Sequence, residues 1–139
     1  MGDKCKLLKK ADRLFVTHFF TIFRYDDQTS EILAKACVRG AGLTGKIACI
    51  SAPTAYIAIK KHFPEAKAVL FEYDKHFVTF GEDFVFYDYK SPLAAPKELG
   101  SVFDLVLADP PFLSDECLTK TAVTLKFLAK DKILLCTGT

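Results

Sequence analysis

The sequence predicts an α/β domain built around a parallel sheet. From residue 26 onward, short apolar runs alternate with helix-like segments, and half of the 139 residues are hydrophobic. Strands that are apolar throughout occur in parallel sheets that helices cover on both faces. A chain of this length forms one domain with a buried core. We therefore predict a single domain over 1–139, with a helical N-terminal part at 1–45 and a sheet-containing core at 46–139.

The first 23 residues are predicted to form an amphipathic helix. Five Lys or Arg and two Asp occur up to Arg13, and a mostly apolar run follows. A secretory signal is not expected, because this run contains His18 and leads into RYDD instead of a small-residue cleavage site. Lys6 stands where a myristoylation signal requires Ser or Thr. The helix should have an aromatic surface that packs on the rest of the domain.

The next helix is predicted over 27–39, and another over 54–63. Asp27 can cap the first, whose apolar stripe consists of Ile32, Leu33, Ala36 and Cys37. The glycines that should end it are Gly40, Gly42 and Gly45. The second begins after Pro53 and stops before Pro64, because proline suits a first helical turn and disrupts an interior.

Five apolar runs are predicted as strands. They lie at 46–51, 68–74, 84–89, 102–109 and 132–138. A short helical turn is expected at 75–81, and 90–100 should be mostly loop because it contains two prolines. A last helix is predicted over 114–130, where acids near the start and lysine toward the end suit the helix dipole.

Charge and cysteine usage narrow the functional classes. The formal net charge of +2 gives no broad basic field, so electrostatics does not independently favour a nucleic-acid partner. The five cysteines are Cys5, Cys37, Cys49, Cys117 and Cys136, without a Cys-x-x-Cys pair or a His-rich spacing. This pattern indicates reduced thiols in an intracellular protein, most of them in the core, and no metal site.

Acidic residues follow three of the first four predicted strands. The strand ends read SAPT, FEYD, YDY and ADPPF. Parallel strands end at one edge of a sheet, and carboxylates are costly to cluster there unless something binds them. An acid after the second strand suits a ribose diol, and one after the third can accept from an adenine amino group. No glycine-rich phosphate loop follows the first strand, so a nucleoside without phosphates, S-adenosylmethionine, fits best.

Asp109, Pro110, Pro111 and Phe112 follow the fourth strand. Proline cannot donate to a sheet ladder, so both prolines lie outside the strand and stiffen its carboxyl end. Taken alone, Asp-Pro-Pro is explained at least as well by a turn. With the other strand ends, it favours a rigid group held beside a bound ligand.

DPPF resembles the Asp/Asn-Pro-Pro-Phe/Tyr motif of class I amino-methyltransferases, which act on nitrogen. The longer blocks KIACISAPTAY, LFEYDKHF, FVFYDY, FDLVLADPPFLSDECLTKT and KILLCTGT are similar to the eukaryotic elongation factor 1A lysine methyltransferase family, formerly grouped with N6-adenine-specific DNA methyltransferases. The resemblance covers residues 23–139. It implies a cytoplasmic, S-adenosylmethionine-dependent protein-lysine N-methyltransferase whose substrate is translation elongation factor 1A.

The resemblance also implies site residues. The cofactor-binding set is Ser51, Ala52, Pro53, Glu72, Asp74 and Asp88, with Glu72 at the ribose hydroxyls and Asp88 at the adenine amino group. The catalytic set, at the acceptor nitrogen, is Asp109, Pro110, Pro111 and Phe112. Tyr25 and Thr29 match an amino-terminal motif for substrate or cofactor closure, in which Arg24 replaces a usual tryptophan.

The implied fold is a Rossmann-like class I methyltransferase whose cofactor-binding core spans 46–139. Its strands, counted along the chain, should lie in the order 3-2-1-4-5, without the last two of the family's seven. The fifth strand would then be an exposed edge, open to self-association unless the amino-terminal helix or another chain covers it. Two other functions stay open: an N6-adenine nucleic-acid methyltransferase, and a truncated, non-catalytic cofactor-binding or interaction module.

Overall fold

The computed structural model describes residues 5–9, 27–42, 44–88, 90–93, 96–108 and 115–136. The strands are β1 (Cys5–Lys9), β2 (Lys46–Ile50), β3 (Lys67–Glu72), β4 (Phe84–Phe86), β5 (Phe103–Ala108) and β6 (Ala129–Cys136). The α-helices are α1 (Asp27–Ala41), α2 (Pro53–His62) and α3 (Asp115–Leu128). Two 3₁₀ segments, η1 (Lys75–Asp83) and η2 (Lys97–Leu99), complete the described elements.

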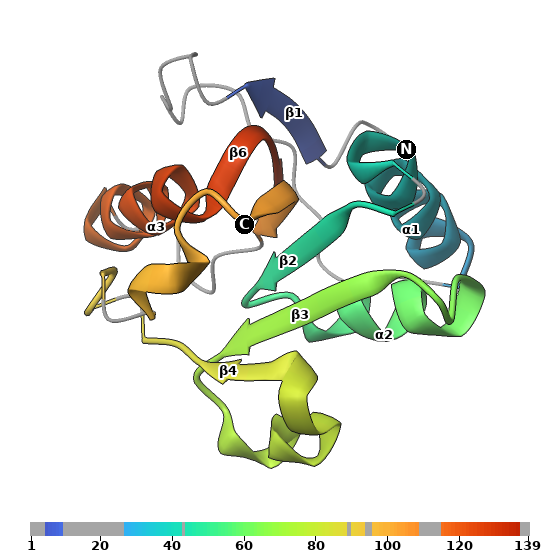
Figure 1. Ribbon diagram of the computed structural model, residues 1–139, viewed down its shortest axis with the longest axis horizontal. Coiled ribbons are helices and arrows are strands. Elements are labelled where there is room, and N and C mark those ends of the chain that lie inside the picture. Colours follow the sequence, from blue (N-terminus) through green and yellow to red (C-terminus); the bar gives the residue numbers. More distant parts are fainter. Residues whose placement is uncertain are drawn as a thin grey trace.

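The six strands form one sheet in the order β1-β6-β5-β2-β3-β4 (Figure 1). All pairs between β2, β3, β4, β5 and β6 are parallel. These are the five predicted strands, counted from β2, so their order confirms the predicted 3-2-1-4-5. Ile50 at the end of β2 pairs with Phe71 of β3 and with Ala108 of β5. The carboxyl ends of these strands therefore meet at one edge, and the chain reverses its winding direction between β2 and β5. In open α/β sheets, ligands bind at such a point.

The amino terminus corrects one prediction. Cys5–Lys9 is a strand, so the helix predicted for the first 23 residues is wrong over this stretch. β1 runs antiparallel to β6, from the pair Cys5↔Cys136 to the pair Lys9↔Lys132. The fifth predicted strand is therefore not an open edge, and its exposure no longer argues for self-association. The strand forms because the backbone N–H and C=O groups on the outer edge of β6 need hydrogen-bond partners, which an extended β1 supplies. Local sequence patterns do not reveal a partner so far away in the chain.

Removing residues 1–9 is expected to expose β6 and lower stability. The shortened chain should unfold several degrees below the full chain and self-associate through the freed edge. Thermal unfolding and sedimentation velocity would show both effects. The matched control is Lys6→Ala, which keeps the β1 backbone and should stay monomeric. A shortened chain that is as stable and as monomeric as the full one would show that β1 contributes little to the fold.

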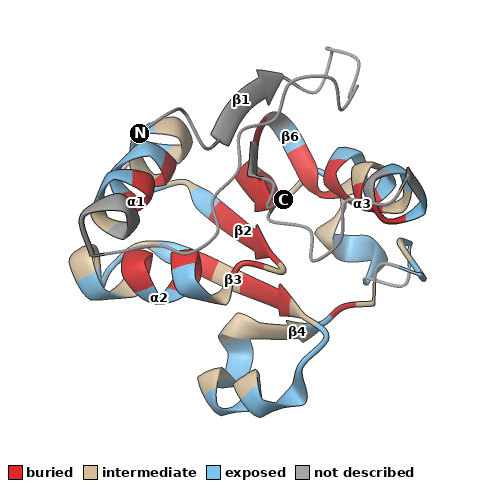
Figure 2. Ribbon diagram, turned by 180° about the vertical axis from the view of Figure 1, so that it is seen from behind, coloured by how far each residue is buried: buried red, intermediate tan, exposed pale blue. Residues whose placement is uncertain are grey.

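Helices cover both faces of the sheet and bury two clusters (Figures 1 and 2). On one face, α1 and α2 pack on inward residues that include Ile47, Cys49, Leu70 and Leu107. On the other, α3 packs on Ala48, Ile50, Phe71 and Val106. Successive residues of β2 thus alternate between the two clusters, as strand geometry requires. Burial on both sides explains why these strands read as continuous apolar runs.

Helix α1 confirms the predicted element and, of its predicted stripe, Leu33 and Cys37 but not Ile32 and Ala36. The buried residues are Leu33, Ala34 and Cys37, whereas Ile32 is 58% exposed and Ala36 is exposed. The helix also continues through Gly40 to Ala41, so Gly40 does not end it. A Cβ at Gly40 would lie 3.4 Å from the Leu105 side chain of β5. A glycine at this position allows close packing of α1 on the sheet. Gly42, with a φ of +89°, then ends the helix.

The described cysteines lie in the core, as predicted. Cys37, Cys49 and Cys117 are buried, and burial raises the pKa of the Cys37 thiol to about 12. Burial also raises the pKa of the Cys49 thiol, so the Cys37 and Cys49 thiols stay protonated at neutral pH and act as small apolar side chains. The side chains of Cys5 and Cys136 lie outside the described part. Within the described residues, no group of three His, Cys, Asp or Glu could hold a metal ion, and no helix is long and apolar enough to span a bilayer.

Candidate active site

The turn from β2 to α2 holds Ser51, Ala52 and Pro53 at the carboxyl edge of the sheet. Ser51 has a φ of +55°, in the left-handed region that favours glycine. Its N–H donates to the Phe71 carbonyl oxygen at 2.7 Å, which ties the turn to β3. Ala52 is buried, and Pro53 occupies the first position of α2. The chain therefore makes a glycine-type tight turn without glycine, at the place where the resemblance puts the methionine part of the cofactor.

Glu72 is the last residue of β3 and is half-buried. Its Oε2 accepts from the backbone N–H groups of Tyr73, at 2.5 Å, and Asp74, at 3.2 Å. Its Oε1 has no hydrogen-bond partner among the described residues. The backbone thus fixes the direction of the carboxylate and leaves one oxygen for a donor such as a ribose hydroxyl.

Asp74 is exposed and begins η1. Its Oδ1 accepts from the His76 N–H at 2.9 Å and lies 2.7 Å from Nδ1 of the same residue. The backbone N–H of His76, more than its ring, holds the pKa of the Asp74 carboxyl below its usual value. These bonds direct Asp74 toward its own helix. Of the two neighbouring acids, Glu72 is the better placed to meet a ligand over the end of β3.

Asp88 follows β4 and lies in a tight turn. Its Oδ1 accepts from the Lys90 N–H at 3.0 Å, and its carbonyl oxygen accepts from the Ser91 N–H at 2.9 Å. The preceding residue, Tyr87, donates its N–H to the Glu72 carbonyl oxygen at 3.0 Å. The structure therefore places Glu72 and the Asp88 turn at the ends of two paired strands, as the sequence predicted.

Two exposed aromatic rings beside these acids were not predicted from the sequence. Tyr73 and Phe86 are 64% and 48% exposed, and their ring centroids lie 5.5 Å apart. The Lys75 ammonium lies 5.1 Å from the centre of the Phe86 ring. The two rings offer an apolar surface beside the strand-end acids, against which a planar ligand could pack. The signal in the sequence is that each aromatic residue lies within two positions of a strand-end acid.

Several predicted site residues cannot be placed. Asp109, Pro110, Pro111, Phe112 and Tyr25 lie outside the described residues. Thr29 lies in α1, but its side chain is not described. The catalytic and closure sets therefore remain sequence-based predictions. The described neighbours of the catalytic set are Ala108, the last residue of β5, and Asp115, the first of α3.

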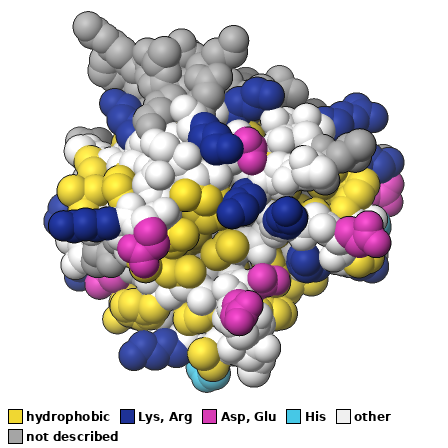
Figure 3. Space-filling model, in the orientation of Figure 1, with side chains coloured by type: hydrophobic (Ala, Val, Ile, Leu, Met, Phe, Trp, Pro, Cys, Tyr) yellow, Lys and Arg dark blue, Asp and Glu magenta, His cyan; other side chains and the backbone are white. Residues whose placement is uncertain are grey.

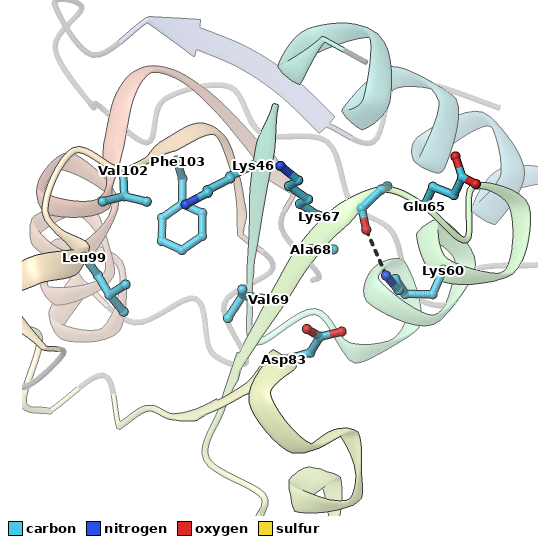
Figure 4. Close-up of a pocket in the computed structure, with 11 residues that line it drawn as sticks. Lys46, Lys60, Glu65, Lys67, Ala68, Val69, Asp83, Leu99, Val102 and Phe103 are labelled. Atoms are coloured by element: carbon cyan, nitrogen blue, oxygen red, sulfur yellow. Dashed lines mark hydrogen bonds between the residues drawn. The ribbon is translucent and has the colours of Figure 1, made fainter. Parts of the chain in front are cut away.

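A cavity of about 350 Å³ lies away from the predicted site (Figure 4). Its lining includes Lys46, Lys67 and Phe103, the first residues of β2, β3 and β5. It therefore lies at the amino edge of the sheet, opposite the edge that carries Glu72 and Asp88. Lys60, also in the lining, donates to the Ala66 carbonyl oxygen at 2.8 Å. In the view of Figure 3, basic and acidic side chains surround an area of exposed hydrophobic side chains.

Comparison with solved structures supports the fold. The chain resembles a Zn-dependent alcohol dehydrogenase from Rhodobacter sphaeroides with a TM-score of 0.54 and 20% sequence identity. The match covers 78% of this chain and 45% of that one. At this identity the likeness concerns the fold alone, and it is consistent with a Rossmann-like arrangement.

Comparison with protein sequences identifies the family. The family model described as "Probable N6-adenine methyltransferase" matches residues 20–139. EEF1A lysine methyltransferase 1 from Bos taurus is 48% identical over 84% of this chain and 52% of its own length. The protein of that name from Danio rerio is 47% identical over 84% of this chain and 73% of its own length. A protein-lysine N-methyltransferase, EFM5, from Saccharomyces cerevisiae is 39% identical over the same share of this chain and 54% of its own.

The chain spans about half the length of the cow and yeast relatives. The family match nevertheless covers all of β2 to β6 and the acids at their carboxyl ends. The sequence matches identify the same family as the motifs of the chain, and the observed strand order is the one expected for that family. The chain belongs to the EEF1A lysine methyltransferase family, whose family model is described as "Probable N6-adenine methyltransferase".

Proposed function

We propose that this protein is an S-adenosylmethionine-dependent protein-lysine N-methyltransferase that acts on translation elongation factor 1A in the cytoplasm. The observation that carries the proposal is the placement of Glu72 and Asp88 at the paired ends of β3 and β4, in a chain whose relatives are named lysine methyltransferases. The substrate and the location follow the relatives' names and the family resemblance.

The described residues fit the adenosine part of this cofactor. Ribose hydroxyls and the adenine amino group are hydrogen-bond donors, and the groups that face this edge, the Glu72 and Asp88 carboxylates, accept hydrogen bonds. The exposed rings of Tyr73 and Phe86 offer apolar faces beside them. No glycine-rich phosphate loop is needed, because this cofactor carries no phosphate. When bound, S-adenosylmethionine supplies a methyl group that its sulfonium already activates.

The remaining task of the protein is to align the acceptor. The Asp109 carboxylate and the Pro110 carbonyl oxygen would accept hydrogen bonds from the lysine amine and direct its lone pair at the methyl group. The two prolines would keep these acceptors in place, since a misplacement of ~1 Å can cost ~100-fold in rate. Phe112 would cover the lysine stem. The amine must lose its proton before it attacks, because only the neutral form has a free lone pair.

Adenine N6 methylation is the second candidate. It is favoured by the description of the family model, since an exocyclic amine would meet the same Asp-Pro-Pro-Phe acceptors. Against it stand the names of the relatives and the formal net charge of +2, which gives little attraction to nucleic acid.

A transfer assay with labelled S-adenosylmethionine separates these functions. The full chain would be incubated with elongation factor 1A, with DNA and with RNA, and each acceptor analysed for methylated residues. We expect methyl-lysine in elongation factor 1A alone. Label on adenine would establish the second candidate. Cofactor binding without transfer to any acceptor would support the non-catalytic module.

A further inference from the structure

Thr124 of α3 connects the two ends of the turn that carries Asp88. Its hydroxyl oxygen lies 3.1 Å from the Tyr87 hydroxyl and 2.8 Å from the Pro92 carbonyl oxygen. Tyr87 precedes Asp88 in the sequence, and Pro92 follows Ser91. One side chain from a distant helix therefore contacts both sides of the acid-bearing turn.

The direction of these hydrogen bonds follows from which groups can donate a proton. The Pro92 carbonyl can only accept, so Thr124 donates its one hydroxyl proton there, and the Lys120 carbonyl, at 3.4 Å, is a weaker alternative. Thr124 must then accept from Tyr87. Burial raises the pKa of the Tyr87 hydroxyl, which therefore keeps its proton for this bond. The result is a directed chain from Tyr87 through Thr124 to Pro92.

The Tyr87 and Thr124 side chains of this chain are buried, and Pro92 is half-buried. Thr124 is 0% exposed and Tyr87 is 5% exposed, and no buried side-chain nitrogen or oxygen among the described residues lacks a partner. Removing the Thr124 hydroxyl would take this acceptor from the buried Tyr87 hydroxyl and this donor from the half-buried Pro92 carbonyl. The turn would then lose the side chain that ties its two ends together.

The turn in question carries the acid predicted at the adenine. The Asp88 carboxylate accepts from Lys90 and its carbonyl accepts from Ser91, both between the two anchored ends. α3 also follows directly after residues 109–114, which contain the predicted catalytic set. The Thr124 hydroxyl therefore links two parts of the predicted site. It fixes the turn that carries Asp88 relative to α3, the helix that follows the predicted catalytic residues.

We infer that Thr124 is a positioning residue for cofactor binding, which acts by fixing the Tyr87–Pro92 turn and with it the Asp88 carboxylate. The inference rests on the proposed function. Thr124→Val has nearly the same shape but lacks the hydroxyl. It should weaken binding of S-adenosylhomocysteine by roughly 3- to 30-fold, and should shift the NMR amide signals of Lys90 and Ser91.

Two variants separate positioning from general stability. Thr124→Ser keeps the hydroxyl and should restore most of the affinity. Tyr56→Phe is the matched control, because it also removes one hydroxyl hydrogen bond, from Tyr56 to Asp83 at 2.5 Å, but leaves the Thr124 contacts in place. It should lower thermal stability with little change in affinity.

Calorimetric titration of each folded variant at one temperature provides the test. Wild-type affinity in Thr124→Val, with or without a loss of thermal stability, would overturn the inference and leave the proposed function standing. Equal losses in Thr124→Val and Thr124→Ser would also overturn it, because the hydroxyl would not be the cause. A wild-type chain that does not bind S-adenosylhomocysteine would contradict the proposed function itself, and the inference with it.

Discussion

Asp109→Ala is expected to slow methyl transfer to elongation factor 1A by about 100-fold or more per folded molecule. The reason is that the acceptor amine would lose the carboxylate that orients it and accepts its hydrogen bond. Affinity for S-adenosylhomocysteine should stay within a few-fold of the wild-type value, because Asp109 is assigned to the acceptor and not to the adenosine. Single-turnover rates and calorimetry would measure the two quantities separately.

Asp109→Asn is the matched control for this prediction. Asparagine keeps an oxygen acceptor and occurs in the Asp/Asn-Pro-Pro-Phe/Tyr motif, so this variant should retain much more activity than alanine. Phe112→Ala should also lower turnover, and Pro111→Ala should do so more mildly through lost stiffness. If Asp-Pro-Pro is only a turn, Asp109→Ala will cost about 1 kcal/mol of stability and transfer at the wild-type rate per folded molecule.

Glu72→Ala is expected to weaken binding of S-adenosylhomocysteine by about 1 to 3 kcal/mol, the usual range for a lost charged hydrogen bond. Glu72 lies at the end of β3, with one oxygen held by backbone N–H groups and the other without a hydrogen-bond partner in the described part of the chain. Asp88→Ala should have an effect of similar size. Calorimetric titration of the folded variants would measure both.

Asp74→Ala is the internal comparison for Glu72→Ala. Since Asp74 bonds to the backbone and ring of His76, its removal should loosen η1 and reduce affinity less than loss of Glu72. If the Glu72→Ala and Asp88→Ala variants both bind S-adenosylhomocysteine as tightly as the wild-type chain, there is no basis for placing the adenosine at this edge.

The core of the fold was predictable because its signals are local. β2, β3 and β5 are short apolar runs, and each predicted boundary lies within two residues of the observed one. β4 is shorter than predicted and ends at Phe86, because the chain turns at Asp88 instead of continuing to residue 89. The strand order came from the family resemblance and was confirmed.

The features that the sequence did not reveal depend on distant contacts. β1 is extended because it pairs with β6, more than 120 positions away. The buried face of α1 includes Ala34 and not Ile32, and this depends on how the helix packs on α2 and the sheet. The sequence gives no sign that Thr124 has a special role, because its contacts with Tyr87 and Pro92 form only in the folded chain.

The placement of the acids at the strand ends was predictable from the sequence, but the details of their contacts were not. Acids at strand ends indicated a nucleoside ligand, and the structure brings Glu72 and the Asp88 turn together. The separate orientation of Asp74 depends on backbone hydrogen bonds of a 3₁₀ segment, which residue types alone do not specify. The exposed pair of Tyr73 and Phe86 likewise depends on the register between β3 and β4.

A crystal structure of the full chain with S-adenosylhomocysteine tests the central claim most directly. We predict that the ribose hydroxyls lie within hydrogen-bond distance of Glu72 and that the adenine amino group contacts Asp88, over the carboxyl ends of β3 and β4. The cavity at the amino edge, lined by Lys46, Lys67 and Phe103, should stay free of the ligand. Adenosine bound in that cavity, or bound without contact to either acid, would contradict the account.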